Sequence, residues 1–348
     1  MNRIALLAVY LLAVLFRLWP GWRGYLGDES FTYYFASANP LFGYMDVHPA
    51  GYYLFMRGIL FLGDWQPAVL VVAHALFAAL AAPLAYLISP WAGFAVALWP
   101  GLVEAGNHAR HPAFAATLVA AWALAWTRRR NLLPFLAHLM VLGHFSTQVV
   151  LGLSFPLMRR EERVAVFSSL SYNPLVYLEV IRLITMAQSV LKDEGAPLVP
   201  NWAGALDALL APGVWALPLA VAVALGVLRQ PILGFWMLGV GVAYFLGSRV
   251  NPLYMPPMAV LAAMAAGLTA EGVAWTRWGR ALALAGFVAL VFLACQTSEK
   301  RREARAGALE EVRTLHQKPL TPAPGLPILV MNAHILGLPI TIDACRKP

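Results

Sequence analysis

The sequence has few charged residues for its length. Only 12% of its 348 residues are charged, whereas 60% are hydrophobic and the mean hydropathy is +0.67. Soluble domains carry about 25% charged residues. A chain with half that density cannot cover a globule of this size with solvated groups, so a water-soluble fold is excluded. The main solvent must be lipid, where the backbone forms helices or a closed barrel.

Cysteine is nearly absent, and acidic residues are outnumbered by basic ones. Two cysteines, Cys295 and Cys345, are too few for a disulfide framework or a zinc site. The chain has 25 Lys and Arg against 17 Asp and Glu, a net charge of +8. Its basic residues stand in short clusters between apolar runs, which is typical of membrane topology signals. We therefore expect membrane lipids, and no nucleic acid, as partners.

Long unbroken apolar runs are what the chain does contain. Such runs favour helices over the alternating pattern of a membrane barrel. We predict an all-α polytopic membrane protein with about eleven transmembrane helices, several of them shorter than the roughly 20 residues of a full crossing. The predicted spans are Ile4–Trp19, Ala68–Ile88, Trp91–Gly106, Pro112–Thr127, Leu132–Gly143, Thr147–Met158, Val164–Thr185, Pro212–Leu228, Ile232–Ser248, Pro252–Ala270 and Ala281–Gln296. The two spans between Leu132 and Met158 are alternatively one long kinked helix.

The apolar segment His48–Gly63 is predicted to lie in the membrane interface. It contains Arg57 and only about 16 residues, which is short for a span. If it does not cross, Arg128–Arg130 and most other basic clusters fall inside, as the positive-inside rule requires. Residues 20–67 then form one extracytoplasmic loop, and the turns at Asn107–His111 and Gly143–Thr147 lie on the same side.

The segment after the last span is the exception to this topology. We divide the chain into a transmembrane domain, residues 1–296, and a small extramembrane tail, residues 297–348, with the C-terminus outside. Lys300, Arg301, Arg302 and Arg305 would then be outside, against the positive-inside rule. An even number of spans therefore stays open.

Acidic residues in the first loop are candidates for chemistry because acids are scarce. Asp28 and Glu29 open an aromatic run, where a helix cap and a first-turn charge are the structural alternative. Asp46 and His48 precede Pro49 at a predicted helix start. A helix N-terminus with a nearby cation attracts phosphate, although Asp46 as a plain cap explains the pattern too.

Cations on the same side are candidates for binding a phosphate. Arg110 lies in a turn with His111, and a guanidinium matches the oxygen pair of a phosphate. Arg249 and Arg57 offer the same chemistry, and snorkelling to lipid headgroups is the alternative for an arginine at this depth. His144 is a weaker candidate, since an apolar setting favours a structural histidine. A carboxylate base beside such cations suits transfer of a group from a lipid phosphate.

Three stretches resemble one known superfamily. They are Gly27-Asp28-Glu29 after the first span, Tyr44-Met45-Asp46-Val47-His48-Pro49-Ala50, and the span from Leu76 to Tyr86. Together they resemble the GT-C superfamily of glycosyltransferases that use polyprenyl-phosphate sugars, with protein O-mannosyltransferases and the aminoarabinose transferases of lipid A nearest. The resemblance covers roughly the first 150 residues. The chain departs from the pattern where Ala50 replaces a second proline and Ala115 stands in place of an acid.

The resemblance implies a fold and roles for these residues. It implies a GT-C type bundle with two juxtamembrane helices in the first loop. Asp28 would activate the acceptor, with Glu29 in support. By the same resemblance, His48 and Arg110 would lie at the donor's lipid phosphate, and Arg57, Arg110 or Arg249 would supply a charge that the family has and this chain lacks. Asp46, His111 and His144 are the further candidates for donor binding.

The predicted function is transfer, with inversion, of a sugar from a polyprenyl-phosphate donor to an acceptor on the extracytoplasmic face of the cell membrane. The acceptor is a lipid, a glycan or a protein. No cofactor is certain; a divalent cation at Asp28 or Asp46 stays open. The alternatives are a membrane transporter and a non-catalytic protein that binds polyprenyl lipids.

Overall fold

The fold is all helical wherever the computed structural model describes the chain. It describes residues 3–21, 29, 32–33, 36, 50–181, 201–210, 213–246 and 254–315, and within these ranges no strand occurs. Three helices are long and apolar enough to cross a membrane: Ala68–Tyr86, Pro256–Val273 and Arg277–Glu310. Two bent pairs raise the number to five if each pair is one span. The prediction of an α-helical membrane protein is therefore confirmed. By length and composition, three to five helices of the described residues qualify as membrane spans, fewer than the eleven predicted.

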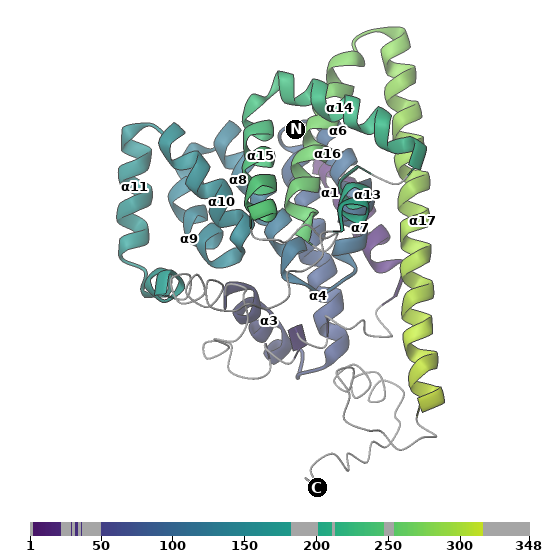
Figure 1. The fold of residues 1–348 in the computed structure, drawn as a ribbon, viewed down its shortest axis with the longest axis horizontal. Helices are drawn as coiled ribbons and strands as arrows, with labels where there is room; N and C mark the ends of the chain where they lie inside the picture. Colours follow the sequence, from purple (N-terminus) through teal and green to yellow (C-terminus); the bar gives the residue numbers. More distant parts are fainter. Residues whose placement is uncertain are drawn as a thin grey trace, which may run out of the picture.

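Figure 1 shows how the helices are arranged, and most of them lie within or close to the predicted apolar runs. Their bounds are α1 Arg3–Leu18, α3 Ala50–Leu62, α4 Pro67–Ala79, α5 Ala81–Tyr86, α6 Pro90–Leu98, α7 Pro100–Gly106, α8 His111–Arg128, α9 Leu133–Gly143, α10 Phe145–Ser154, α11 Arg160–Ser171, α13 Trp202–Leu210, α14 Ala216–Arg229, α15 Pro231–Leu246, α16 Pro256–Val273 and α17 Arg277–Leu315, with short 3-10 turns at Arg130–Leu132, Phe155–Leu157 and Gly213–Trp215.

Small residues let α16 pack at the centre of the bundle. A Cβ at Gly267 would come within 2.4 Å of the backbone nitrogen of Ala92 in α6, and one at Gly226 in α14 within 1.8 Å of the Ala265 carbonyl oxygen. Helices in lipid associate largely by such close backbone approach, because apolar burial gives little gain there. The alanines of α16 accordingly contact α6, α8 and α14.

Breaks in the helices explain why the count of long spans is small. Trp99 has an extended backbone, because Pro100 disfavours the helical conformation of the residue before it, and it separates α6 from α7. His144 is extended as well and separates α9 from α10, so the stretch between Leu132 and Met158 forms two helices that meet near the predicted turn at Gly143–Thr147. The predicted span Val164–Thr185 is bent by 84° between α11 and a helix at Pro174–Ile181.

The helix α3 packs against α4 and α9. Gly51 at its start meets the backbone of Leu142 near the end of α9, and its remaining contacts include α4. Its inner face consists of Tyr52, Met56 and Leu60, which are fully buried. The turns at Gly143–His144 and at 107–110 lie at this end of the bundle too, which we call the site end.

The last helix, α17, continues far beyond its apolar part (Figure 1). It runs without interruption from Arg277 to Leu315, so the predicted division between residues 296 and 297 falls inside one helix. The hydroxyl of Ser298 donates to the carbonyl of Phe16 at 3.0 Å, which places the start of the polar part beside the end of α1. The polar half of α17 is therefore packed on the site end of the bundle.

Candidate functional site

The turn 107–110 joins α7 to α8 and is fixed to the end of α1. The amide of Asn107 donates to the carbonyl oxygens of Arg17, at 2.7 Å, and Gly21, at 3.3 Å. Gly106 permits this approach, since a Cβ there would lie 2.5 Å from Cδ of Arg17. Pro112 in the first turn of α8 ends the turn, because its missing N–H costs nothing at that position.

Glu29 is held at this turn by a buried ion pair. Its side chain is fully buried and accepts the backbone N–H of Ala109 at 3.2 Å. Arg305 of α17 donates to both carboxylate oxygens, at 2.6 and 3.1 Å, and through Nε to the Asn107 side chain at 2.9 Å. A two-pronged pair of this kind fixes both position and orientation. Glu29 therefore connects the first loop, the turn 107–110 and α17.

Thr32 gives the first loop a second contact to the same turn. Its hydroxyl donates to the carbonyl of Ala109 at 2.8 Å. The backbone of Ala109 therefore accepts a hydrogen bond from Thr32 and donates one to Glu29. Both Glu29 and Thr32 lie in helical backbone, which agrees with the expected helix in this part of the loop.

A cationic opening lies on the other side of the turn. We call it the polar groove and define it as two adjoining pockets, of about 30 and 410 Å³, that share Gly101, Glu104, Ala208 and Arg301. His108 and Arg110 line the smaller pocket, and Lys300 and Asp207 line the larger one. Arg301 forms an ion pair with Glu104 inside the groove. Because guanidinium and ammonium groups bind phosphate oxygens, the groove can hold a phosphate.

His108 is a neutral component of this groove. Burial lowers its pKa well below the usual value, and the positive charges of Arg301, Arg110 and Arg305 lower it further, with His74 adding to the effect. A neutral imidazole among three guanidinium groups leaves the positive charge of the groove to the arginines and Lys300. His108 is therefore suited to hydrogen bonding and not to charge neutralisation.

His111 and His144 stack on each other near the groove. Their ring centroids lie 4.7 Å apart with an angle of 24° between the planes, and Tyr254 lies 6.3 and 6.5 Å from them. Nδ1 of His144 also accepts the backbone N–H of Ser146 at 3.2 Å, so His144 caps α10. This capping gives His144 a structural role that its sequence context already favoured.

Arg57 lies elsewhere on the site end. Its guanidinium donates to the carbonyl of Ala36 at 3.1 Å and lies 5.5 Å from the ring centroid of Trp65. These contacts connect α3 to the first loop and to its own C-terminal turn. The structure thus brings Glu29, Arg110, His111 and His144 together around one turn and gives Arg57 separate anchoring contacts.

Four predicted site residues, Asp28, Asp46, His48 and Arg249, lie outside the described residues. Asp28 and Asp46 were also the candidates for holding a divalent cation. Within the described ranges, no group of three or more His, Cys, Asp or Glu side chains is arranged to hold a metal ion. The divalent cation at Asp28 or Asp46 stays a prediction.

Sequence reasoning missed Arg305, Arg301 and Glu104 as parts of the site. The signal was present in the basic cluster Lys300–Arg305, which contradicts the positive-inside rule if the C-terminus is outside. The structure gives these charges acidic partners: Arg305 pairs with Glu29, Arg301 with Glu104, and Arg302 with Glu299. The cluster is thus held by tertiary contacts at the site end.

Comparison of the chain with protein-family models, with curated proteins and with solved structures finds no match.

Proposed function

We propose that the protein is a membrane glycosyltransferase of GT-C type, which moves a sugar from a polyprenyl phosphate to an acceptor with inversion at the anomeric carbon. The observation that carries the proposal is the position of Glu29. It is bonded to the N–H of Ala109, and the next residue in the chain, Arg110, lines the polar groove. Glu29, which follows Asp28 in the sequence, therefore lies beside the polar groove.

In the proposed reaction, an acceptor hydroxyl or amine attacks the anomeric carbon of the donor. A bond forms from the acceptor oxygen or nitrogen to that carbon, and the bond between the carbon and the phosphate oxygen breaks. The electron pair leaves on the phosphate oxygen, and the acceptor proton moves to the carboxylate of Asp28. The polyprenyl phosphate departs with an added negative charge, which Arg110 and the other cations of the groove stabilise.

Glu29 is assigned a positioning role. Its carboxylate is engaged by both arms of the Arg305 guanidinium and by the Ala109 N–H, so its lone pairs are committed to holding the loop. Three hydrogen bonds within the protein thus engage its carboxylate oxygens, and an incoming substrate would have to displace one of them. Asp28 therefore remains the proposed base, while Glu29 keeps its neighbour in place.

The remaining residues and the topology complete the proposal. Asp46, His48, His111 and Arg249 contribute to the donor-binding region with Arg110, while Arg57 and His144 hold α3 and α10 in place beside it. The chain crosses the cell membrane about eleven times, counting the short and broken helices as spans. The site end then faces the extracytoplasmic side, which is also the side of the predicted first loop.

A transporter is the second candidate, and the bent helices favour it. The 84° bend between α11 and Pro174–Ile181, and the 63° bend between Trp202–Leu210 and Gly213–Arg229, are breaks of the kind found in discontinuous transporter helices. A lipid-binding protein without catalysis is the third. Release of polyprenyl phosphate from a sugar-loaded lipid separates these candidates, because only a transferase breaks the sugar–phosphate bond.

The experiment uses the purified full chain with sugar-loaded polyprenyl phosphates and an acceptor mixture. We expect release by the wild type and a loss of at least about 100-fold for Asp28→Asn, in line with removal of a general base. Asp64→Asn is the matched control: Asp64 is exposed, and its positive φ of 51° suits Asn as well as Asp. Full release by Asp28→Asn would contradict the mechanism, and no release by the wild type with any donor would contradict the proposed function.

A further inference from the structure

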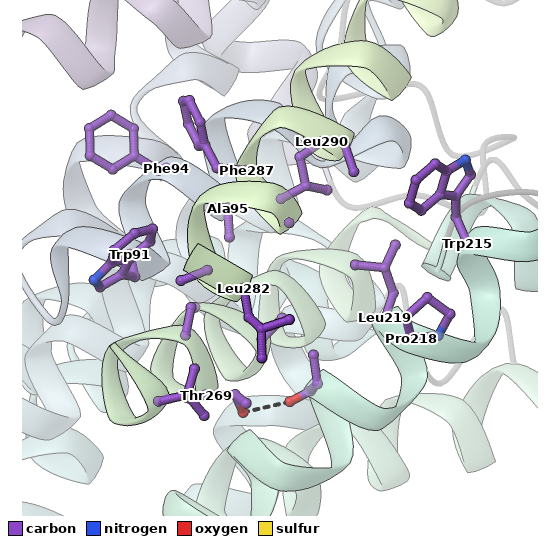
Figure 2. A pocket seen from close by; sticks show the side chains of 18 of the residues that line it. Trp91, Phe94, Ala95, Trp215, Pro218, Leu219, Thr269, Leu282, Phe287 and Leu290 are labelled. Carbon is purple, nitrogen blue, oxygen red and sulfur yellow. Dashed lines mark hydrogen bonds between the residues drawn. The ribbon is translucent and has the colours of Figure 1, made fainter. Parts of the chain in front are cut away.

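An apolar pocket opens on the bundle between α6, α14, α16 and α17. Its volume is about 260 Å³, and its walls include Phe94, Trp215, Leu219, Phe287 and Leu290 (Figure 2). Thr269 brings a hydroxyl to the wall, but that hydroxyl donates to the carbonyl of Ala222 at 2.6 Å and is satisfied within the protein. The pocket therefore suits a hydrocarbon and offers little to a polar ligand.

The apolar pocket and the polar groove lie along one face of α17. The pocket takes Leu282, Gly286, Leu290 and Leu293 from this helix, and the groove takes Thr297, Lys300, Arg301 and Ala304. Apart from the consecutive pair Lys300 and Arg301, these positions recur at intervals of three and four residues, so they lie toward one side of the helix. Leu293 and Thr297 are one turn apart, about 6 Å along the axis.

This alignment places the apolar opening and the polar groove end to end, and the larger pocket of the groove is lined by the bases Lys300 and Arg301 and by the acids Glu104 and Asp207. A ligand that fills both must have a hydrocarbon chain and an anionic head. Lys300 and Arg301 match the charge of a phosphate, and Arg301 has five N–H donors in total, so its pairing with Glu104 leaves further donors for a ligand. A free phosphate would leave the apolar opening unused, and an uncharged hydrocarbon would leave the cations unused.

We infer that this face of α17 binds a lipid phosphate, with its hydrocarbon chain in the apolar pocket and its phosphate against Lys300 and Arg301. The inference rests on the proposed function in that the lipid is the polyprenyl phosphate carrier of the reaction. It goes further by assigning the hydrocarbon chain to the walls formed by Phe94, Trp215 and Phe287, none of which belongs to the sequence motifs of the first loop.

Gly286 offers a direct test of the chain site. It lines the apolar pocket, and a Cβ added there meets nothing within 4 Å. Gly286→Phe therefore fills the pocket without displacing backbone, and it removes a poor helix former from α17. Gly152→Phe is the matched control, because Gly152 is exposed on α10 and a Cβ there also meets nothing within 4 Å.

The measurement is equilibrium binding of a long-chain polyprenyl phosphate, without sugar, to the purified full chain in nanodiscs of zwitterionic lipid. We expect Gly286→Phe to weaken binding about tenfold or more, which corresponds to about 1.4 kcal/mol, whereas Gly152→Phe binds like the wild type. Lys300→Gln should weaken binding of the same lipid, since it removes a charge that faces the phosphate. Inorganic phosphate should compete poorly in each case.

The outcomes separate this inference from the proposed function. Unchanged binding by Gly286→Phe, or equal weakening by Gly152→Phe, would overturn the chain site even if the protein proves to be a transferase. Strong competition by inorganic phosphate would also overturn it, because the chain would then contribute nothing. Chain-dependent binding without any sugar transfer would uphold the lipid site and contradict only the catalytic proposal.

Discussion

At the scale of single residues, the pair Glu29–Arg305 is the most consequential contact of the site. Both side chains are almost completely buried, and they are 276 residues apart in the sequence. A buried charge without its partner is costly, whereas an exposed pair contributes little. The chain also contains an exposed pair on the same helix, Arg302 with Glu299, which provides an internal standard.

We predict that Arg305→Ala lowers the free energy of unfolding by about 3–5 kcal/mol, because it leaves the Glu29 carboxylate buried without its counter-ion. Arg302→Ala should change it by less than about 1 kcal/mol. Thermal unfolding of the two variants in the same detergent measures the difference. Replacing both Glu29 and Arg305 by methionine should recover part of the loss, and equal effects of Arg305→Ala and Arg302→Ala would contradict a buried pair.

The pH dependence of stability should report on His108. Because its pKa in the folded protein is lowered, chiefly by burial, the folded state stays neutral while the unfolded chain takes up a proton near pH 6.5. Stability from this residue is therefore complete above about pH 6.5 and declines as the pH falls below that value. Melting temperatures measured from pH 8 to pH 5 should fall less steeply for His108→Gln than for the wild type. Identical slopes would show that His108 is protonated as easily in the folded protein as in the unfolded chain.

At the scale of elements, α3 depends on a close backbone contact at its first turn. A Cβ at Gly51 would lie 2.2 Å from the carbonyl oxygen of Leu142, whereas a Cβ at Gly58 on the same helix meets nothing within 4 Å. By helix propensity alone, replacing either glycine with alanine should stabilise the helix. At Gly51 the close contact with Leu142 makes the same replacement unfavourable.

We predict that Gly51→Ala destabilises the protein by about 1–3 kcal/mol through overpacking, and that Gly58→Ala leaves it unchanged or stabilises it by up to about 1 kcal/mol. Unfolding measured for both variants under one condition tests the contrast. In the transfer assay, Gly51→Ala should also lose activity, because α3 adjoins the first loop. A neutral Gly51→Ala would place α3 farther from α9 than the structure has it.

The polar half of α17 is the second element with a specific role. It supplies Arg301 to the polar groove and Arg305 to Glu29. We predict that ending the chain after Gln296 destabilises it more than Arg305→Ala does, because both ion pairs and the Ser298 contact are lost. Ending the chain after Leu315 keeps these contacts and is the control, with the yield of monodisperse protein and its melting temperature as readouts. If both truncated chains behave alike, α17 does not hold the first loop.

At the scale of the whole molecule, the two ends of the helix bundle predict which residues face each side of the membrane. The turn 107–110 and the polar half of α17 lie at the site end, while Arg128 at the end of α8 contacts Ile88 at the opposite end. In a chain with Cys295 and Cys345 replaced, we expect an impermeant thiol reagent to label Gly307→Cys in intact cells. Arg129→Cys should be labelled only after the membrane is opened. Labelling of both positions in intact cells would contradict the proposed topology.

Much of the fold could be predicted from local sequence, and the partners within the site could not. Proline positions and apolar lengths locate α8, α14, α15 and α16 to within a few residues, since a helix in lipid satisfies its own backbone. The break at His144 between α9 and α10 and the helical state of α3 follow from the same signals. The pairing of Glu29 with Arg305 depends on how α17 packs against the first loop, and no local pattern encodes it.

The sequence by itself determined that the solvent is lipid and that the chain crosses it as helices, because 12% charged residues cannot cover a soluble surface. It also singled out the few acidic and basic residues predicted on the extracytoplasmic side as candidates for a site. Only the tertiary structure decided which of those charges neutralise one another and which line an open groove. The reason is physical. Glu29 and Arg305 are 276 residues apart in the sequence and come into contact only when the helices between them pack, and this packing depends on the whole chain.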